Sequence, residues 1–134
     1  MSTRRGDVCV IGAGVAGLAA TKFLSPHFNV TVFERSHSIG GVWFYNKGDN
    51  SNTTHVTPMY KNLKTNLPHH LMSFSDHSYP EGTPSFLSHQ QTLDYLEGYC
   101  EKFGLRGLIK FGTTVTMVKP TGNGGWIVCT DDGT

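Results

Sequence analysis

Three glycines and one glutamate are the residues whose types and spacing could do chemistry. Gly12, Gly14 and Gly17 form the pattern G-x-G-x-x-G, and Glu34 follows further along the chain. In a dinucleotide-binding turn the first glycine permits a tight turn, the second lets the backbone approach a pyrophosphate, and the third allows a helix to pack closely on a strand. A carboxylate at the glutamate position accepts hydrogen bonds from ribose hydroxyls and repels the 2′-phosphate of NADP. The pattern therefore predicts a site for FAD or NAD, with a purely structural turn and a solvated surface acid as the alternatives.

The segments around these residues have the pattern of a βαβ unit. Residues 8–11 are a short β-branched run, typical of a parallel strand buried on both faces. The apolar positions from Val15 predict one helical stripe, which ends at Ser25-Pro26 because proline cannot continue the helix. Residues 29–34 predict a second strand. We expect a right-handed crossover, with ligand phosphates at the N-terminus of the helix.

Two further features bear on which dinucleotide binds. The pair Gly40-Gly41 comes soon after Glu34, and it gives the backbone close access to the rest of a long cofactor. This pair favours FAD over NAD. Arg35 could contact a phosphate, and the alternative is an ordinary exposed arginine beside a strand end.

The rest of the chain divides into three parts. Residues 36–88 lack periodicity but carry many aromatic and aliphatic side chains, so we expect them to pack, partly against a ligand. A capping box at Ser88 and Gln91 starts a helix that Gly104 ends, with an apolar face made of Leu93, Leu96, Tyr99, Cys100 and Phe103. Residues 108–111, 113–118 and 126–129 predict a small β-meander, in which Trp126 fills the core under the nucleotide.

Composition excludes several classes of protein. The chain has 134 residues, enough for one domain, and a net charge of +1 without a basic run, which argues against nucleic-acid binding. Its three cysteines are widely spaced, which argues against a disulfide framework or a zinc site and favours a reducing compartment. His69-His70 point apart, so we expect no metal site there.

Targeting signals are also not expected. Arg4-Arg5 precede an apolar run, as in a signal peptide, but Asp7 and the glycines interrupt that run, so we interpret it as part of the fold. No stretch approaches the roughly 20 apolar residues that cross a bilayer. We expect a cytoplasmic protein, with membrane association left open to parts outside these residues.

Several motifs together resemble the N-terminal FAD region of the flavin-containing monooxygenases. They are residues 12–20 (GAGVAGLAA), 33–35 (FER), 39–43 (IGGVW), 60–66 (YKNLKTN), 71–74, 84–86, 95–96 and 110–115. The resemblance covers nearly the whole chain. One departure is Thr21, where many FAD proteins keep glycine or alanine.

The resemblance implies roles for particular residues. The ADP moiety is held by Gly12, Ala13, Gly14, Val15, Ala16 and Glu34, while the backbone of Val115 meets the adenine. The flavin is lined by Gly41, Val42 and Trp43. Thr65-Asn66 lies between flavin and nicotinamide, and Leu67 follows against FAD. The Asn66 amide, which can donate to a peroxide oxygen without adding charge, supports the flavin peroxide; the alternative is a turn residue before Leu67-Pro68.

The resemblance also implies an activity and a fold. NADPH reduces FAD, dioxygen adds to give a flavin C4a-hydroperoxide, and its terminal oxygen passes to an amine nitrogen or a sulfide. The expected fold is α/β, a Rossmann-like FAD-binding domain followed by the irregular segment, helix and β-meander. Residues 1–134 are expected to be its N-terminal part, incomplete at the C-terminus. The NADPH-binding domain is then absent, and the remainder lies in the same or a separate chain. Two alternatives remain: another FAD-dependent oxidoreductase, such as an amine oxidase relative, and a non-catalytic dinucleotide-binding fragment.

Overall fold

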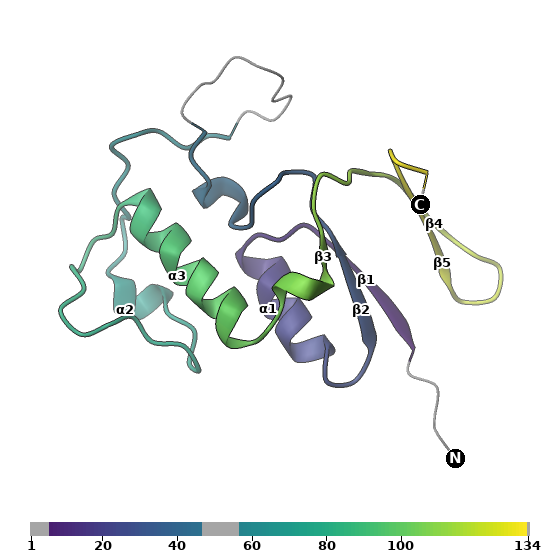
Figure 1. The fold of residues 1–134 in the computed structure, drawn as a ribbon, viewed down its shortest axis with the longest axis horizontal. Helices are drawn as coiled ribbons and strands as arrows, with labels where there is room; N and C mark the ends of the chain where they lie inside the picture. Colours follow the sequence, from purple (N-terminus) through teal and green to yellow (C-terminus); the bar gives the residue numbers. More distant parts are fainter. Residues whose placement is uncertain (1–5, 47–56, 134) are drawn as a thin grey trace.

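A computed structural model of the chain describes residues 6–46 and 57–133. Arg4 and Arg5 lie outside the described residues. The elements, in chain order, are β1 (Asp7–Ile11), α1 (Val15–Leu24), β2 (Asn29–Phe33), the 3₁₀ turn η1 (Gly41–Trp43), α2 (His69–Met72), α3 (His89–Lys102), the 3₁₀ turn η2 (Arg106–Leu108), β3 (Ile109–Lys110), β4 (Val115–Pro120) and β5 (Trp126–Thr130). Figure 1 shows α2 and the β4–β5 hairpin at opposite ends of the molecule, with the parallel sheet and α1 between them.

The predicted βαβ unit is confirmed. Strands β1 and β2 pair in parallel, with Val10 opposite Val32, and α1 connects them. The expected β-meander is wrong, because its first strand belongs elsewhere: β3 pairs in parallel with β2, and the sheet order is β1-β2-β3. Ile109 is buried beside Val32, so its apolar side chain contributes to the sheet core. Strands β4 and β5 pair antiparallel and form a separate two-stranded hairpin.

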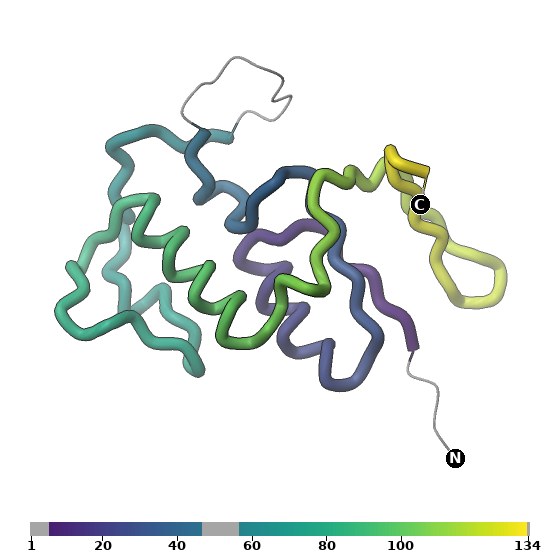
Figure 2. Tube along the Cα trace, in the orientation of Figure 1, coloured from purple at the N-terminus to yellow at the C-terminus, as the bar shows by residue number. Residues whose placement is uncertain are grey.

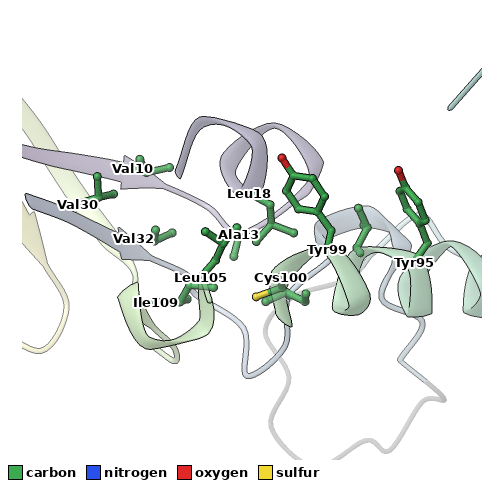
Figure 3. Packing of buried hydrophobic residues seen from close by; sticks show 12 residues of the cluster. Val10, Ala13, Leu18, Val30, Val32, Tyr95, Tyr99, Cys100, Leu105 and Ile109 are labelled. Atoms are coloured by element: carbon green, nitrogen blue, oxygen red, sulfur yellow. The ribbon is translucent and has the colours of Figure 1, made fainter. Parts of the chain in front are cut away.

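The core lies between one face of the sheet, α1 and α3. Figure 3 shows Leu18 of α1 and Tyr99 of α3 meeting near Ala13, with Val10 and Val32 on the strands. The prediction that the first strand is buried on both faces is wrong, since Ile11 is 58% exposed. The prediction for Trp126 is also wrong: its side chain is 67% exposed, because the β4–β5 hairpin projects beyond the sheet (Figure 1).

Helix α1 begins at the glycine turn and ends at Leu24, before the predicted Ser25-Pro26 stop. Its buried positions are Leu18 and Thr21, whereas Phe23 of the predicted stripe is exposed. Thr21 is fully buried, and its hydroxyl donates to the carbonyl of Gly17 at 2.7 Å. The threonine that replaces the glycine or alanine of many FAD proteins therefore leaves no unsatisfied hydroxyl at this position.

Helix α3 has the two ends that the sequence predicts. The Ser88 hydroxyl accepts from the Gln91 N–H at 3.3 Å, and the Gln91 side chain accepts from the Ser88 N–H at 2.9 Å, which completes the capping box. At the other end Gly104 adopts φ +64°, and the Leu105 N–H donates to the backbone carbonyl of Cys100 at 2.9 Å, as in a Schellman motif. Leu96, Tyr99 and Cys100 are buried as predicted, and Tyr95 joins them.

The irregular segment packs on α3, as Figure 2 shows for residues 57–88. The Tyr95 hydroxyl accepts from the Phe74 N–H at 2.7 Å and donates to the His77 carbonyl at 2.6 Å. The Tyr79 ring stacks on Tyr95 with centroids 3.9 Å apart. Within residues 6–46 and 57–133, no helix is long and apolar enough to cross a membrane.

Candidate nucleotide-binding site

The glycine turn lies at the carboxyl end of β1. Gly12 has φ +93°, and its N–H donates to the Phe33 carbonyl at 2.8 Å. A Cβ at Gly17 would lie 1.9 Å from the carbonyl oxygen of Gly12, so no other residue fits there without moving backbone. The first and third glycines thus have the roles that the pattern predicts.

The N-terminus of α1 is open to an anion. Gly14 is its N-cap, no side chain caps it, and its first turn contains no acidic residue. The first amides of a helix have no partner within the helix, and the helix dipole favours negative charge at this end. Val15 and Ala16, in this first turn, are exposed. The geometry suits a phosphate group.

Glu34 is buried, with 6% of its surface exposed, and both of its carboxylate oxygens are held by backbone. Oε2 accepts from the Ala13 N–H at 2.7 Å, and Oε1 accepts from the Ser36 N–H at 2.8 Å. Each oxygen of an ionised carboxylate has a further lone pair, which remains to accept a hydroxyl. The surface-acid alternative for Glu34 therefore does not describe its position. Ser36 was missed from sequence because its contribution is a backbone N–H, which nearly every residue type carries.

The pair Gly40-Gly41 folds back onto the glycine turn. The Gly40 N–H donates to the Ala13 carbonyl at 2.9 Å, and both glycines have positive φ, +101° and +56°. A Cβ at Gly41 would lie 3.3 Å from the Cα of Gly14, so the two backbones are in contact. The next two residues form the rest of η1: Val42 is exposed, and Trp43 packs partly buried against the core.

The connection between β3 and β4 completes this end of the sheet. The Glu34 N–H donates to the Lys110 carbonyl at 2.9 Å, and the Thr113 N–H donates to the Glu34 carbonyl at 3.0 Å. Val115 begins β4 directly after this connection and is partly buried. Thr113 is buried; the sequence places it at the start of the predicted strand 113–118 and in the motif 110–115, but does not single it out. The exposed Arg35 is compatible with both of its interpretations.

The Thr65–Leu67 segment is attached elsewhere, at the start of α3. Thr65 is buried, and its N–H donates to the Leu87 carbonyl at 2.8 Å. Asn66 and Leu67 are exposed. The structure therefore brings the glycine turn, Glu34 and the Gly40-Gly41 pair into direct contact, while the segment with Asn66 bonds to Leu87, just before α3.

Two of the described cysteines have thiols whose environment disfavours the thiolate. Burial raises the pKa of the Cys9 thiol and of the Cys100 thiol, so both favour the neutral form, which is a poor nucleophile. Across residues 6–46 and 57–133, no group of three or more His, Cys, Asp or Glu side chains could hold a metal ion.

A parallel sheet with a glycine turn, a helix N-terminus and a buried acid at its carboxyl edge defines a dinucleotide-binding α/β fold. The family model described as "FMO-like: Flavin-binding monooxygenase-like" matches residues 5–133. The chain belongs to this family.

Individual relatives agree with the family model. The chain is 40% identical over 112 residues to "Dimethylaniline monooxygenase [N-oxide-forming] 4" of Rattus norvegicus, across 83% of this chain and 20% of the relative. The solved S-allyl-L-cysteine S-oxygenase from Allium sativum matches with a TM-score of 0.82 and 34% identity, across 99% of this chain and 34% of the other. A steroid monooxygenase bound to NADP matches with a TM-score of 0.79 and 28% identity, across 98% of this chain and 24% of the other. The chain thus spans between a fifth and about a third of the length of these proteins.

Proposed function

We propose that residues 1–134 are the N-terminal part of the FAD-binding domain of an NADPH-dependent flavin monooxygenase that oxygenates amine nitrogen or sulfide sulfur. The observation that carries this proposal is the convergence of Glu34, the glycine turn and the Gly40-Gly41 pair at one edge of the sheet. An N-oxide-forming relative and an S-oxygenase among the similar structures support the substrate class.

The residues present suit the ADP half of FAD. A diphosphate would meet the amides of the first turn of α1, where no acidic side chain competes with it. The free lone pairs of Glu34 would accept the ribose hydroxyls, while the Ala13 and Ser36 amides fix the carboxylate. The backbone of Val115 would meet the adenine at the far side of the same edge.

The flavin half would lie along residues 41–43, since backbone contact between Gly41 and Gly14 continues the site away from the glycine turn. When bound, FAD supplies the redox chemistry, accepting a hydride from NADPH and activating dioxygen. The chain's own residues position it. The exposed Val42 offers an apolar surface, and the Asn66 amide would donate to oxygen without introducing charge.

Water exclusion is the second task of these residues. Leu67 is exposed beside Asn66. Phe86, also exposed, lies between Ser85 and Leu87, which bond to the backbone of the segment containing Asn66. These apolar side chains would keep water from the reacting oxygen, which favours transfer over release.

The NADPH site is proposed to lie mostly outside residues 1–134, with Thr65-Asn66 next to the nicotinamide. The remaining parts belong to the same polypeptide or to a separate chain. We propose a cytoplasmic protein that uses FAD, NADPH, dioxygen and a small amine or sulfide, without a metal. Membrane association through the remaining parts stays compatible with this proposal.

The test uses the full-length protein purified with FAD, with NADPH, isotope-labelled dioxygen, and either a tertiary amine or a thioether. We expect one labelled oxygen atom in the N-oxide or sulfoxide for each NADPH consumed. Hydrogen peroxide formed in equal amount to substrate oxidised, without labelled product and without need for NADPH, would instead identify an oxidase. If the protein purifies without flavin and does not bind added FAD, the result would indicate a non-catalytic nucleotide-binding module.

A further inference from the structure

The short segment that carries Asn66 is joined to the residues just before α3 by two hydrogen bonds. Thr65 and Leu87 exchange two hydrogen bonds: the Thr65 N–H donates to the Leu87 carbonyl at 2.8 Å, and the Leu87 N–H donates to the Thr65 hydroxyl oxygen at 2.9 Å. Lys64 and Ser88 form an antiparallel bridge beside them. Leu87 is fully buried, so this junction is part of the protein interior.

The Thr65 hydroxyl also bonds to Leu67, the residue that follows Asn66. It donates its hydrogen to the carbonyl of Leu67 at 2.9 Å while it accepts from Leu87. Thr65 is 5% exposed. A hydroxyl has one hydrogen, and here that hydrogen is committed within the chain. The residues before and after Asn66 are therefore connected to each other and to Leu87, just before α3, through one buried hydroxyl.

The support at the start of α3 is itself well defined. The Ser88–Gln91 capping box fixes the first turn of the helix. One turn further on, Leu93 contacts the other flavin-side segment: a Cβ at Gly40 would lie 2.5 Å from the Leu93 Cδ1. The Asn66 segment and the Gly40–Trp43 turn thus rest on the same stretch of helix.

We propose that Thr65 is a positioning residue, whose buried hydroxyl holds the Asn66 amide where it can donate to oxygen and which does not itself contact cofactor through that hydroxyl. This inference rests on the proposed function, because it takes Asn66 as the residue that acts on oxygen. Its effect on the reaction runs entirely through Asn66.

The experiment compares four variants and one control variant of the full-length, FAD-loaded protein with the wild type. Thr65→Val keeps the shape of the side chain but removes the hydroxyl, and Thr65→Ser keeps the hydroxyl. Asn66→Ala removes the amide, and the double variant Thr65→Val/Asn66→Ala closes the cycle. Thr83→Val is the matched control, because its hydroxyl also donates to a nearby carbonyl, that of Pro80, but away from Asn66. The readouts are flavin content, hydrogen peroxide released per NADPH oxidised, and hydrogen exchange at the Leu87 amide.

We expect Thr65→Val to retain flavin, to release about tenfold more hydrogen peroxide per NADPH, and to exchange the Leu87 amide about tenfold faster, since a buried hydrogen bond and the position it fixes are lost. Thr65→Ser should restore both values, and Thr83→Val should match the wild type. The double variant should leak no more peroxide than Asn66→Ala alone.

Two results separate this inference from the function beneath it. If the wild type transfers oxygen efficiently and Asn66→Ala leaks, but Thr65→Val stays coupled, the positioning role is overturned while the proposed function stands. Additive leakage in the double variant would overturn it too, because Thr65 would then act independently of Asn66. Wild-type protein that binds FAD without any oxygen transfer would overturn the proposed function itself.

Discussion

At the scale of single residues, Glu34 is a buried carboxylate that is also the proposed acceptor of the ribose hydroxyls. Its two oxygens accept from the Ala13 and Ser36 amides, so an isosteric amide cannot serve both donors. We expect Glu34→Gln to weaken FAD binding by about 1.5–3 kcal/mol, the usual worth of charge-assisted hydrogen bonds. Fluorescence titration of the apoprotein with FAD measures this. Glu97→Gln, at an acid on α3 paired with Arg106, is the control, and equal affinities for the two variants would refute the assignment.

Gly17 gives a second prediction at this scale. Its missing side chain leaves room for the carbonyl of Gly12, which a Cβ would approach to 1.9 Å. We expect Gly17→Ala to destabilise the fold by about 3 kcal/mol or more, because backbone must move to relieve the overlap. Gly107→Ala is the matched control, since nothing lies within 4 Å of a Cβ there. Urea unfolding of the full-length variants compares the two, and equal midpoints would contradict the structure.

Among single residues, those whose side chains carry the signal could be predicted from sequence. Gly12, Gly17 and Glu34 are recognisable by type and spacing: the two glycines have the backbone geometry that the pattern predicts, and Glu34 is buried beside the glycine turn. Ser36 could not be found in this way, because its role belongs to its backbone. The hydroxyl of Thr65 could not be assigned to Leu67 and Leu87 either, since its partner Leu87 lies 22 positions away in the sequence.

At the scale of elements, two tyrosines of α3 offer a contrast within one helix. The Tyr95 hydroxyl joins Phe74 to His77, whereas the buried Tyr99 hydroxyl finds no hydrogen-bond partner among the described residues. Burial raises the pKa of both phenols, which are therefore neutral. In Figure 3 the two hydroxyls point the same way from the helix.

Removing each hydroxyl should consequently have different effects. We expect Tyr95→Phe to cost about 1–3 kcal/mol, because it leaves the Phe74 N–H and the His77 carbonyl without their partner. Tyr99→Phe should be neutral or stabilising, because it removes a hydroxyl that gains nothing from burial. Thermal unfolding of both variants is the measurement. A larger loss for Tyr99→Phe would reveal a partner for its hydroxyl.

Elements defined by local chemistry were predicted well, and those defined by distant pairing were not. The capping box and Gly104 mark both ends of α3, and Ser25-Pro26 marks the end of α1. The sequence predicts a meander that includes residues 109–110, because a two-residue strand shows no periodicity that identifies its neighbour. Its partner is β2, far away in the sequence, and Ile109 is buried opposite Val32 in this pairing.

At the scale of the whole molecule, an ion pair joins the irregular segment to the βαβ unit. Lys22 of α1 lies 2.5 Å from the Asp76 carboxylate, and Lys102 of α3 donates to the Asp76 backbone carbonyl. The hydrogen bond from Lys22 lowers the pKa of Asp76 below its ordinary value. Since Asp76 binds its proton less readily when folded, its contribution to stability is present above the ordinary pKa and disappears as pH falls through the lowered one.

The pH dependence of unfolding follows from this sign. Between about pH 5 and pH 2 the wild type should lose more stability than Lys22→Met, in which Asp76 has lost the cation that lowers its pKa most and keeps the weaker effect of Lys102. Thermal melting across this range measures the difference. Arg106→Met is the comparison, because it removes the cation of a more exposed ion pair, that between Arg106 and Glu97. Parallel pH profiles for wild type and Lys22→Met would show that the Asp76 pair contributes nothing.

The arrangement of the molecule around its site has one more consequence, which concerns entropy. Where Gly14 meets Gly41 the contact is between backbones, so no side-chain rotamers separate the proposed diphosphate end of the site from the proposed flavin end. Glycine loses more conformational freedom than any other residue when a chain folds. That loss falls at folding, before any ligand arrives, and it need not be repeated at binding. The residues with the most flexible backbone in the unfolded chain thus form a contact that we expect to be preorganised before the cofactor binds.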